Sequence, residues 1–212
     1  MPAAAGYGEI EEAAHADGLI VMGTLVQDGR TLVLLGAGAD FWPAFQAAPE
    51  ARDTAPDPVD RWSLRVVGAL AVQFGARASF PFGGPPYAPF IRWAEASGRA
   101  FKSPVGMLVH DTVGMMISYR GALHMAGVAM PADRSASPCP PCSAPCATAC
   151  PVGALRAGAP YDLAACHAYL DSPPGRDCME RGCKARRACP VSAGAGRTDA
   201  QSAHHMKAFH PS

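Results

Sequence analysis

All eight cysteines of this 212-residue chain lie between Cys139 and Cys189. The first motif, C-x2-C-x3-C-x3-C-P, contains Cys139, Cys142, Cys146 and Cys150. The second group, C-x11-C-x4-C-x5-C-P, contains Cys166, Cys178, Cys183 and Cys189. Thiolates bind iron and zinc, and thiols also oxidise to disulfides. These eight residues are therefore the candidate metal ligands of the chain.

The spacing of the first motif is close to that of a bacterial two-cluster ferredoxin, C-x2-C-x2-C-x3-C-P, in which the fourth cysteine ligates the other cluster. Both groups here end in Ala-Cys-Pro-Val, which indicates an internal duplication. Proline disfavours helix at the preceding cysteine and turns the chain away from the first three ligands. The pattern predicts two [4Fe–4S] clusters. One would be held by Cys139, Cys142, Cys146 and Cys189, the other by Cys166, Cys178, Cys183 and Cys150.

Two other uses of the cysteines stay open. Two zinc sites would also use eight thiolates, although zinc ribbons usually pair two C-x2-C knuckles and only Cys139/Cys142 has that spacing. Disulfide scaffolds usually occur in short secreted chains, and the N-terminal sequence shows no basic leader followed by an apolar core. Beside the last cysteine lies a basic patch, which would stabilise an anionic cluster, dock an acidic or phosphate-bearing partner, or form a solvated helix face. It contains Arg181, Lys184, Arg186 and Arg187.

The overall composition gives no sign of nucleic-acid or membrane binding. The chain has 18 basic and 18 acidic residues, so its formal net charge is zero. No apolar run approaches the roughly 20 residues that a membrane span needs. We therefore expect a cytoplasmic protein with no nucleic-acid or membrane partner.

The elements that must position the cysteines divide into two predicted domains, 1–131 and 132–212, because the first part has no cysteine. We predict an α+β fold: a helix-covered mixed sheet followed by a small ferredoxin-like domain. Asp28-Gly29 predicts a hairpin within 19–38. Helices are predicted at Glu9–Ala16, at 57–75 with Asp57 as its cap and Pro58 in its first turn, and at Pro86–Ser97. The segments 106–110 and 114–127 are predicted to form an antiparallel pair.

The first domain also offers candidates for a second cofactor site. Glycines let a ligand approach the backbone closely, and a mainly apolar cleft suits a large flat ring. His110 is expected in a surface turn, from which it could face a ligand. The predicted cleft residues are Phe82, Gly83, Gly84, His110 and Gly114.

The order of these regions resembles the epoxyqueuosine reductase family, the related corrinoid-dependent reductive dehalogenases and, more faintly, B12-processing proteins. The similar part covers about 57–190, with Cys166 in the place of that family's isolated cysteine. The resemblance implies a corrinoid-binding α/β domain that receives electrons from two clusters. The chain departs from the family at Gly114-Met115-Met116, which lacks the family's tryptophan. It also has no carboxylate between Arg77 and Glu95, where the epoxyqueuosine enzymes carry their aspartate.

From these features we expect an iron–sulfur oxidoreductase-like protein that passes electrons to a corrinoid such as cobalamin, or to a flavin such as FMN, in the first domain. The expected partners are an electron-donor protein and a small-molecule substrate. The sequence identifies no catalytic residue. The alternative is a stand-alone ferredoxin-like carrier whose first domain docks partners without doing chemistry.

Overall fold

The computed structural model describes residues 6–126 and 134–211. These residues form two compact units: one of Met1–Ala100 and Ser118–Ala136, and one of Phe101–Ile117 and Ser137–Ser212. This division differs from the predicted one, because 101–117 belongs with the cysteine-containing unit. The predicted boundary at 131/132 lies outside the described residues.

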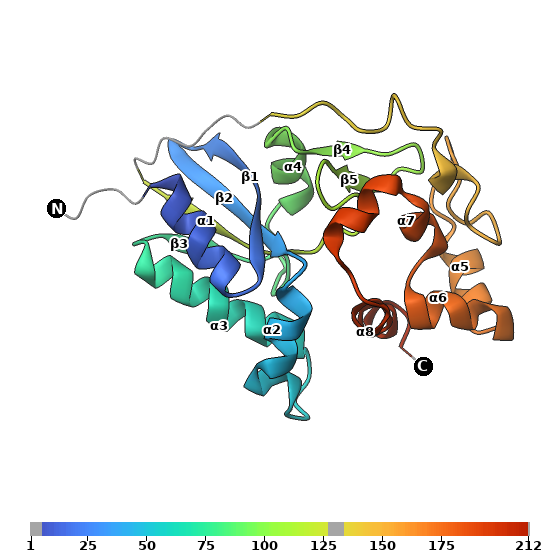
Figure 1. Ribbon diagram of the computed structural model, residues 1–212, viewed down its shortest axis with the longest axis horizontal. Helices are drawn as coiled ribbons and strands as arrows, with labels where there is room; N and C mark the ends of the chain where they lie inside the picture. Colours follow the sequence, from blue (N-terminus) through green and yellow to red (C-terminus); the bar gives the residue numbers. More distant parts are fainter. Residues whose placement is uncertain (1–5, 127–133, 212) are drawn as a thin grey trace. The chain divides into compact units, whose positions relative to one another are not determined.

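The first unit is a sheet with helices on both faces (Figure 1). Its strands are β1 (Leu19–Gln27), β2 (Arg30–Ala37), β3 (Arg77–Ser79) and β6 (Tyr119–Met125), in the order β1-β2-β6-β3. Every pair is antiparallel. The α+β class is therefore confirmed, but the predicted mixed sheet is wrong.

The β1–β2 hairpin forms where Asp28-Gly29 predicts it. Asp28 and Gly29 both have positive φ, 51° and 71°, as a tight primed turn requires. The register pairs Gln27 with Arg30 across the turn. Because side chains alternate between the faces of a strand, Val33 and Leu35 lie in the main core of this unit together with Leu123 of β6.

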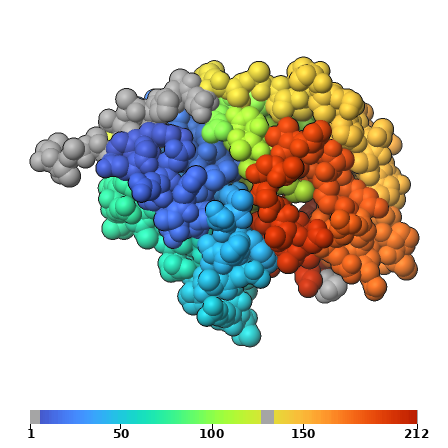
Figure 2. All heavy atoms as spheres, in the orientation of Figure 1, coloured from blue at the N-terminus to red at the C-terminus, as the bar shows by residue number. Residues whose placement is uncertain are grey.

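Helices α1 (Tyr7–Ala16), α2 (Phe41–Ala47) and α3 (Pro58–Gln73) cover that core. The atoms of α1 and α2, in dark and lighter blue, form much of the visible surface of this unit (Figure 2). On α3, Trp62, Val66 and Leu70 are buried against the sheet. Pro58 begins this helix as predicted, but the Asp57 side chain makes no capping hydrogen bond, because Asp57 itself adopts a left-handed conformation.

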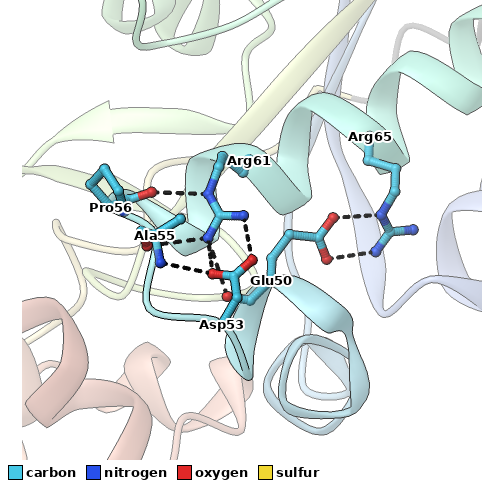
Figure 3. Close-up of polar contacts among 6 residues, drawn as sticks. All are labelled: Glu50, Asp53, Ala55, Pro56, Arg61 and Arg65. Carbon is cyan, nitrogen blue, oxygen red and sulfur yellow. Dashed lines mark hydrogen bonds and ion pairs between the residues drawn. The ribbon is translucent and has the colours of Figure 1, made fainter.

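Two arginines of α3 fix the short helix η1 (Pro49–Ala51) and the turn after it (Figure 3). Arg65 donates to both carboxylate oxygens of Glu50, at 2.6 and 3.0 Å. Arg61 binds Asp53 and the carbonyl oxygen of Pro56. These contacts lower the pKa of the Glu50 and Asp53 carboxyls, since the guanidinium groups favour the charged form.

The opposite face of the sheet is covered by α4 (Phe90–Ala96). Trp93 stacks edge-on against His124, and Phe90 contacts Tyr119. The helix is shorter than the predicted Pro86–Ser97, because proline at 85, 86 and 89 excludes regular helical hydrogen bonding before Phe90.

The second unit has short helices and one small two-stranded sheet (Figure 1). Strands β4 (Ala100–Lys102) and β5 (Leu108–His110) pair with each other, so the predicted pair 106–110/114–127 is wrong apart from one bridge between His110 and Gly114. The remaining α helices are α5 (Leu163–Leu170), α6 (Arg176–Arg181), α7 (Lys184–Ala188) and α8 (Asp199–Phe209). The remaining 3-10 helices are η2 (Pro145–Ala147), η3 (Pro173–Gly175) and η4 (Pro190–Ala195). Among the described parts of the chain, no helix is long and apolar enough to cross a membrane.

Candidate functional site

A cavity of about 340 Å³ lies in the second unit and is lined by four cysteines. Three come from the first motif and one ends the second group; they are Cys139, Cys142, Cys146 and Cys189. We call this arrangement site I. Ser103, Pro104, Val109 and Met115 contribute another part of its wall, and prolines and small residues next to the cysteines complete it.

The three cysteines of the first motif are positioned by a tight local turn. The Cys142 amide donates to the carbonyl of Cys139 at 3.0 Å, and the Ala144 amide donates to Cys142 Sγ at 3.4 Å. Cys146 then lies in η2, where it is buried. Three thiols on one short loop can therefore face a single compact body, as the spacing predicts.

Cys189 reaches the same cavity from the end of α7. It has an extended backbone, with φ −67° and ψ 120°, and Pro190 begins η4 directly after it. The proline acts as predicted, because it ends α7 at Cys189 and turns the chain there. Helix α7 also packs against η2, which brings Cys189 to Cys146.

The segment 110–115 holds η4 in place. The Met115 amide donates to the Ser192 hydroxyl at 3.0 Å. Gly114 has φ +57°, and a Cβ atom there would lie 2.3 Å from the Ser192 nitrogen. Since η4 starts one residue after Cys189, this close contact fixes the last wall of site I.

We call the other four cysteines site II; they are Cys150, Cys166, Cys178 and Cys183. Cys166 interacts electrostatically with both Cys183 and Cys150. Cys178 on α6 interacts with Cys183. The Tyr161 hydroxyl donates to Cys166 Sγ at 3.1 Å. Cys150 is not among the residues that line site I.

Four of the eight thiols, two in each site, are unfavourable places for negative charge in the bare protein. Burial raises the pKa of Cys139 and Cys146 in site I, and neighbouring thiolates raise it further. Burial is also the main cause that raises the pKa of Cys166 and Cys178 in site II. A cationic body between the thiolates would offset both costs. All eight cysteines are free thiols in the structure.

Among the described residues, no group of three or more His, Cys, Asp or Glu side chains is arranged to hold one metal ion. A zinc ion at about 2.3 Å from four sulfurs draws the sulfurs into near contact and leaves no cavity between them. Site I instead surrounds a cavity of about 340 Å³.

The four residues of the basic patch do not all have the same partners. Arg181, Lys184 and Arg187 all contact the carboxylate of Asp177. Arg186 instead interacts with Cys183 and Tyr161. The solvated-face interpretation therefore describes three of these residues, while Arg186 belongs to site II.

The five residues predicted for a second cofactor are not brought together in one unit. Phe82, Gly83 and Gly84 belong to the first unit, whereas His110 and Gly114 belong to the second. His110 is fully buried in β5, where its Nδ1 atom accepts the Thr112 amide at 3.1 Å, so its expected surface position is wrong. Gly114 packs closely against the backbone of η4 at Ser192. None of the five lines the cavity of site I.

Sequence reasoning missed the part of the site I wall formed by Ser103, Pro104 and Val109. These residues carry no metal-binding groups and lie at least 30 residues before the first cysteine, so their spacing gives no signal. A scan against protein-family models and a search of curated proteins found no match for this chain.

Proposed function

We propose that this chain is an electron-transfer protein that binds two [4Fe–4S] clusters. Site I would hold one cluster and site II the other. The observation that carries the proposal is the lining of the site I cavity by Cys139, Cys142, Cys146 and Cys189, with Cys150 grouped among the thiols of site II. A cubane takes one thiolate on each of its four irons, and the crossed fourth ligand is a feature of two-cluster proteins.

The surroundings of site I support an electron carrier. When bound, such a cluster accepts and releases single electrons. The protein residues would bind it through thiolates, and the buried side chains of Val109 and Met115 form an apolar part of the cavity wall. No residue that lines the cavity is charged.

Metal analysis tests the proposal. Protein that is purified and reconstituted without oxygen should contain about eight iron and eight sulfide per chain, since two cubanes need that many. Its absorption should show the broad band of iron–sulfur clusters at the violet edge of the visible spectrum. Stoichiometric zinc with little iron would contradict the proposal.

Paired cysteine variants test the crossed ligation. Replacing Cys150 and Cys166 by alanine removes two ligands of site II and should leave about four iron. Replacing Cys150 and Cys142 by alanine damages both sites and should leave neither cluster complete. The reverse result would show that Cys150 belongs with the first motif, and equal loss in both variants would show that the two sites do not form independently.

Delivery of electrons to a corrinoid or flavin stays a prediction from the resemblance. Titration of cobalamin and of FMN into the anaerobic, cluster-loaded protein tests it through the absorption or fluorescence of each cofactor. If neither binds at high micromolar concentration, the stand-alone carrier is the better description.

A further inference from the structure

The Tyr161 hydroxyl donates a hydrogen bond to the sulfur of Cys166 at 3.1 Å. A tyrosine ring does not need this hydroxyl to fill an apolar space, since phenylalanine has the same ring without it. When Cys166 is a thiolate, its sulfur carries no proton, so the phenol must be the donor. The contact therefore places a neutral donor directly on one of the cysteines of site II.

The start of helix α5 sets this contact. Asp162 is the N-cap residue, and its side chain accepts the Ala165 amide at 2.9 Å. Tyr161 precedes the cap, and Cys166 is the fourth residue of the helix. Side chains at these two positions often pack against each other and fix the angle at which the chain enters the helix. The Asp162 amide also donates to the carbonyl of Ala154 at 3.0 Å, which holds the backbone before the helix. The local fold thus directs the phenol to the sulfur.

Packing holds the Tyr161 ring in the same place. The ring is half-buried and packs against the smaller hydrophobic core, which includes Leu155 and Ala185. Cys150 and Cys183, two other cysteines of site II, pack against the same core. A hydrogen bond to a charged acceptor is stronger than one between neutral groups, and more so away from bulk water. The bond to Cys166 can therefore respond to a change in the charge on its sulfur.

We propose that Tyr161 raises the reduction potential of the cluster at site II through its hydrogen bond to the Cys166 ligand. This inference rests on the proposed function. One-electron reduction makes the cluster and its thiolate ligands more negative, and hydrogen bonds to the sulfurs help to set the potential. The reduced form gains more from the bond than the oxidised form does, so the midpoint moves to a higher value. Tyr161 acts through the ligand and is not a catalytic residue.

A redox titration of the cluster-loaded full chain, followed by electron paramagnetic resonance, tests the inference. A chemical reductant supplies the electrons, and each cluster takes up one. Tyr161→Phe removes the hydroxyl and keeps the ring. We expect about a tenfold change in the ratio of reduced to oxidised cluster at site II, which lowers its midpoint by about 59 mV for one electron. The midpoint of site I should not change.

Two variant backgrounds assign the midpoint to its site. Cys142→Ala/Cys146→Ala protein would retain only site II, and adding Tyr161→Phe should lower its single midpoint. Cys150→Ala/Cys166→Ala protein would retain only site I, and there Tyr161→Phe should have no effect.

Tyr169→Phe is the matched control. It removes the hydroxyl of another half-buried tyrosine in the same unit, one that donates to the carbonyl of Pro174 at 2.9 Å. It should leave both midpoints unchanged. Wild-type protein that contains fluorotyrosine, whose phenol is a stronger donor, should show the opposite shift at site II. This measurement keeps the inference testable if Tyr161→Phe fails to fold.

A site II midpoint that Tyr161→Phe leaves unchanged or raises would overturn the inference. So would an equal shift in Tyr169→Phe, since the effect would then not depend on the bond to the sulfur. In each case the protein would still contain iron and sulfide, so the proposed function would stand. A wild-type protein that contains no clusters would instead contradict the proposed function itself.

Discussion

The hydrogen bonds of the buried His124 side chain fix its tautomer. Arg77 Nη2 lies 3.1 Å from His124 Nδ1, and a guanidinium can only donate, so Nδ1 accepts. The proton is therefore on Nε2, which donates to Ser79 Oγ at 2.8 Å. A serine hydroxyl that accepts this hydrogen bond is not activated by the histidine, because the histidine nitrogen facing it carries a proton and cannot act as its base. The Ser79–His124 pair is thus a structural contact between β3 and β6, and not a nucleophile with its base.

His124 also predicts how stability depends on pH. Burial, and then the positive charges of Arg77 and Arg30, lower its pKa below the ordinary value of about 6.5. As the pH falls below about 6.5, the unfolded chain binds a proton at this residue while the folded chain does not. The free energy of unfolding should therefore decrease with acidification and keep its full value above about pH 6.5.

Urea unfolding of the wild-type protein and of His124→Gln between pH 7.5 and pH 5 measures this contribution. The variant should lose stability less steeply over that range. His15→Gln, a substitution at an exposed residue of α1, is the control. If His124→Gln and the wild-type protein show the same slope, the histidine does not resist protonation in the folded state.

At the scale of elements, local sequence signals were sufficient to predict the elements whose contacts are made between residues close in sequence. Asp28-Gly29 predicts the β1–β2 hairpin, and the apolar face of 57–75 predicts α3. The sequence did not predict the pairing of β4 with β5, because three-residue strands carry too little pattern. It also misplaced His110, which is buried, and Gly114, whose environment depends on η4, about 80 residues later in the chain.

Gly114 offers a test of how 110–115 positions Cys189. Gly114→Ala places a Cβ atom 2.3 Å from the Ser192 nitrogen and 2.7 Å from its Cα, both in the backbone, so η4 must move. The left-handed φ of +57° adds about 1–2 kcal/mol of strain. We expect a lower thermal midpoint and a loss of up to about four iron, since Cys189 is a ligand in the proposed site I.

Gly106→Ala separates the two causes. Gly106 lies in the same unit and has φ +79°, but no atom of the described residues lies within 4 Å of a Cβ there. This variant should show the strain of a left-handed alanine and retain its full iron content. If both variants retain all their iron, contact with η4 does not position Cys189.

At the scale of the whole molecule, the distribution of cysteines predicted two regions but not their composition. The first unit has a core of aliphatic and aromatic side chains without cysteine, as expected of a part that folds without metal. The second core is smaller and includes Cys146 and Cys189 among its buried residues. Its hairpin, 101–117, interrupts the first unit in sequence. Contacts between segments so far apart leave no mark in composition or periodicity, and the sequence therefore assigned 101–117 to the wrong domain.

This division predicts that the two units respond differently to cluster removal. The thiols of the second unit are part of its core, so metal binding there is coupled to folding. The first unit has its own hydrophobic core and hydrogen-bonded sheet. Hydrogen exchange, compared between cluster-loaded and chelator-treated protein, should show large losses of protection in η2, α6 and α7. Protection in β1, β2 and β6 should change little, because amides in a sheet exchange only when that unit opens. Equal loss of protection in both units would mean that the chain unfolds as one cooperative body, and unchanged protection in the second unit would mean that its core does not depend on the clusters.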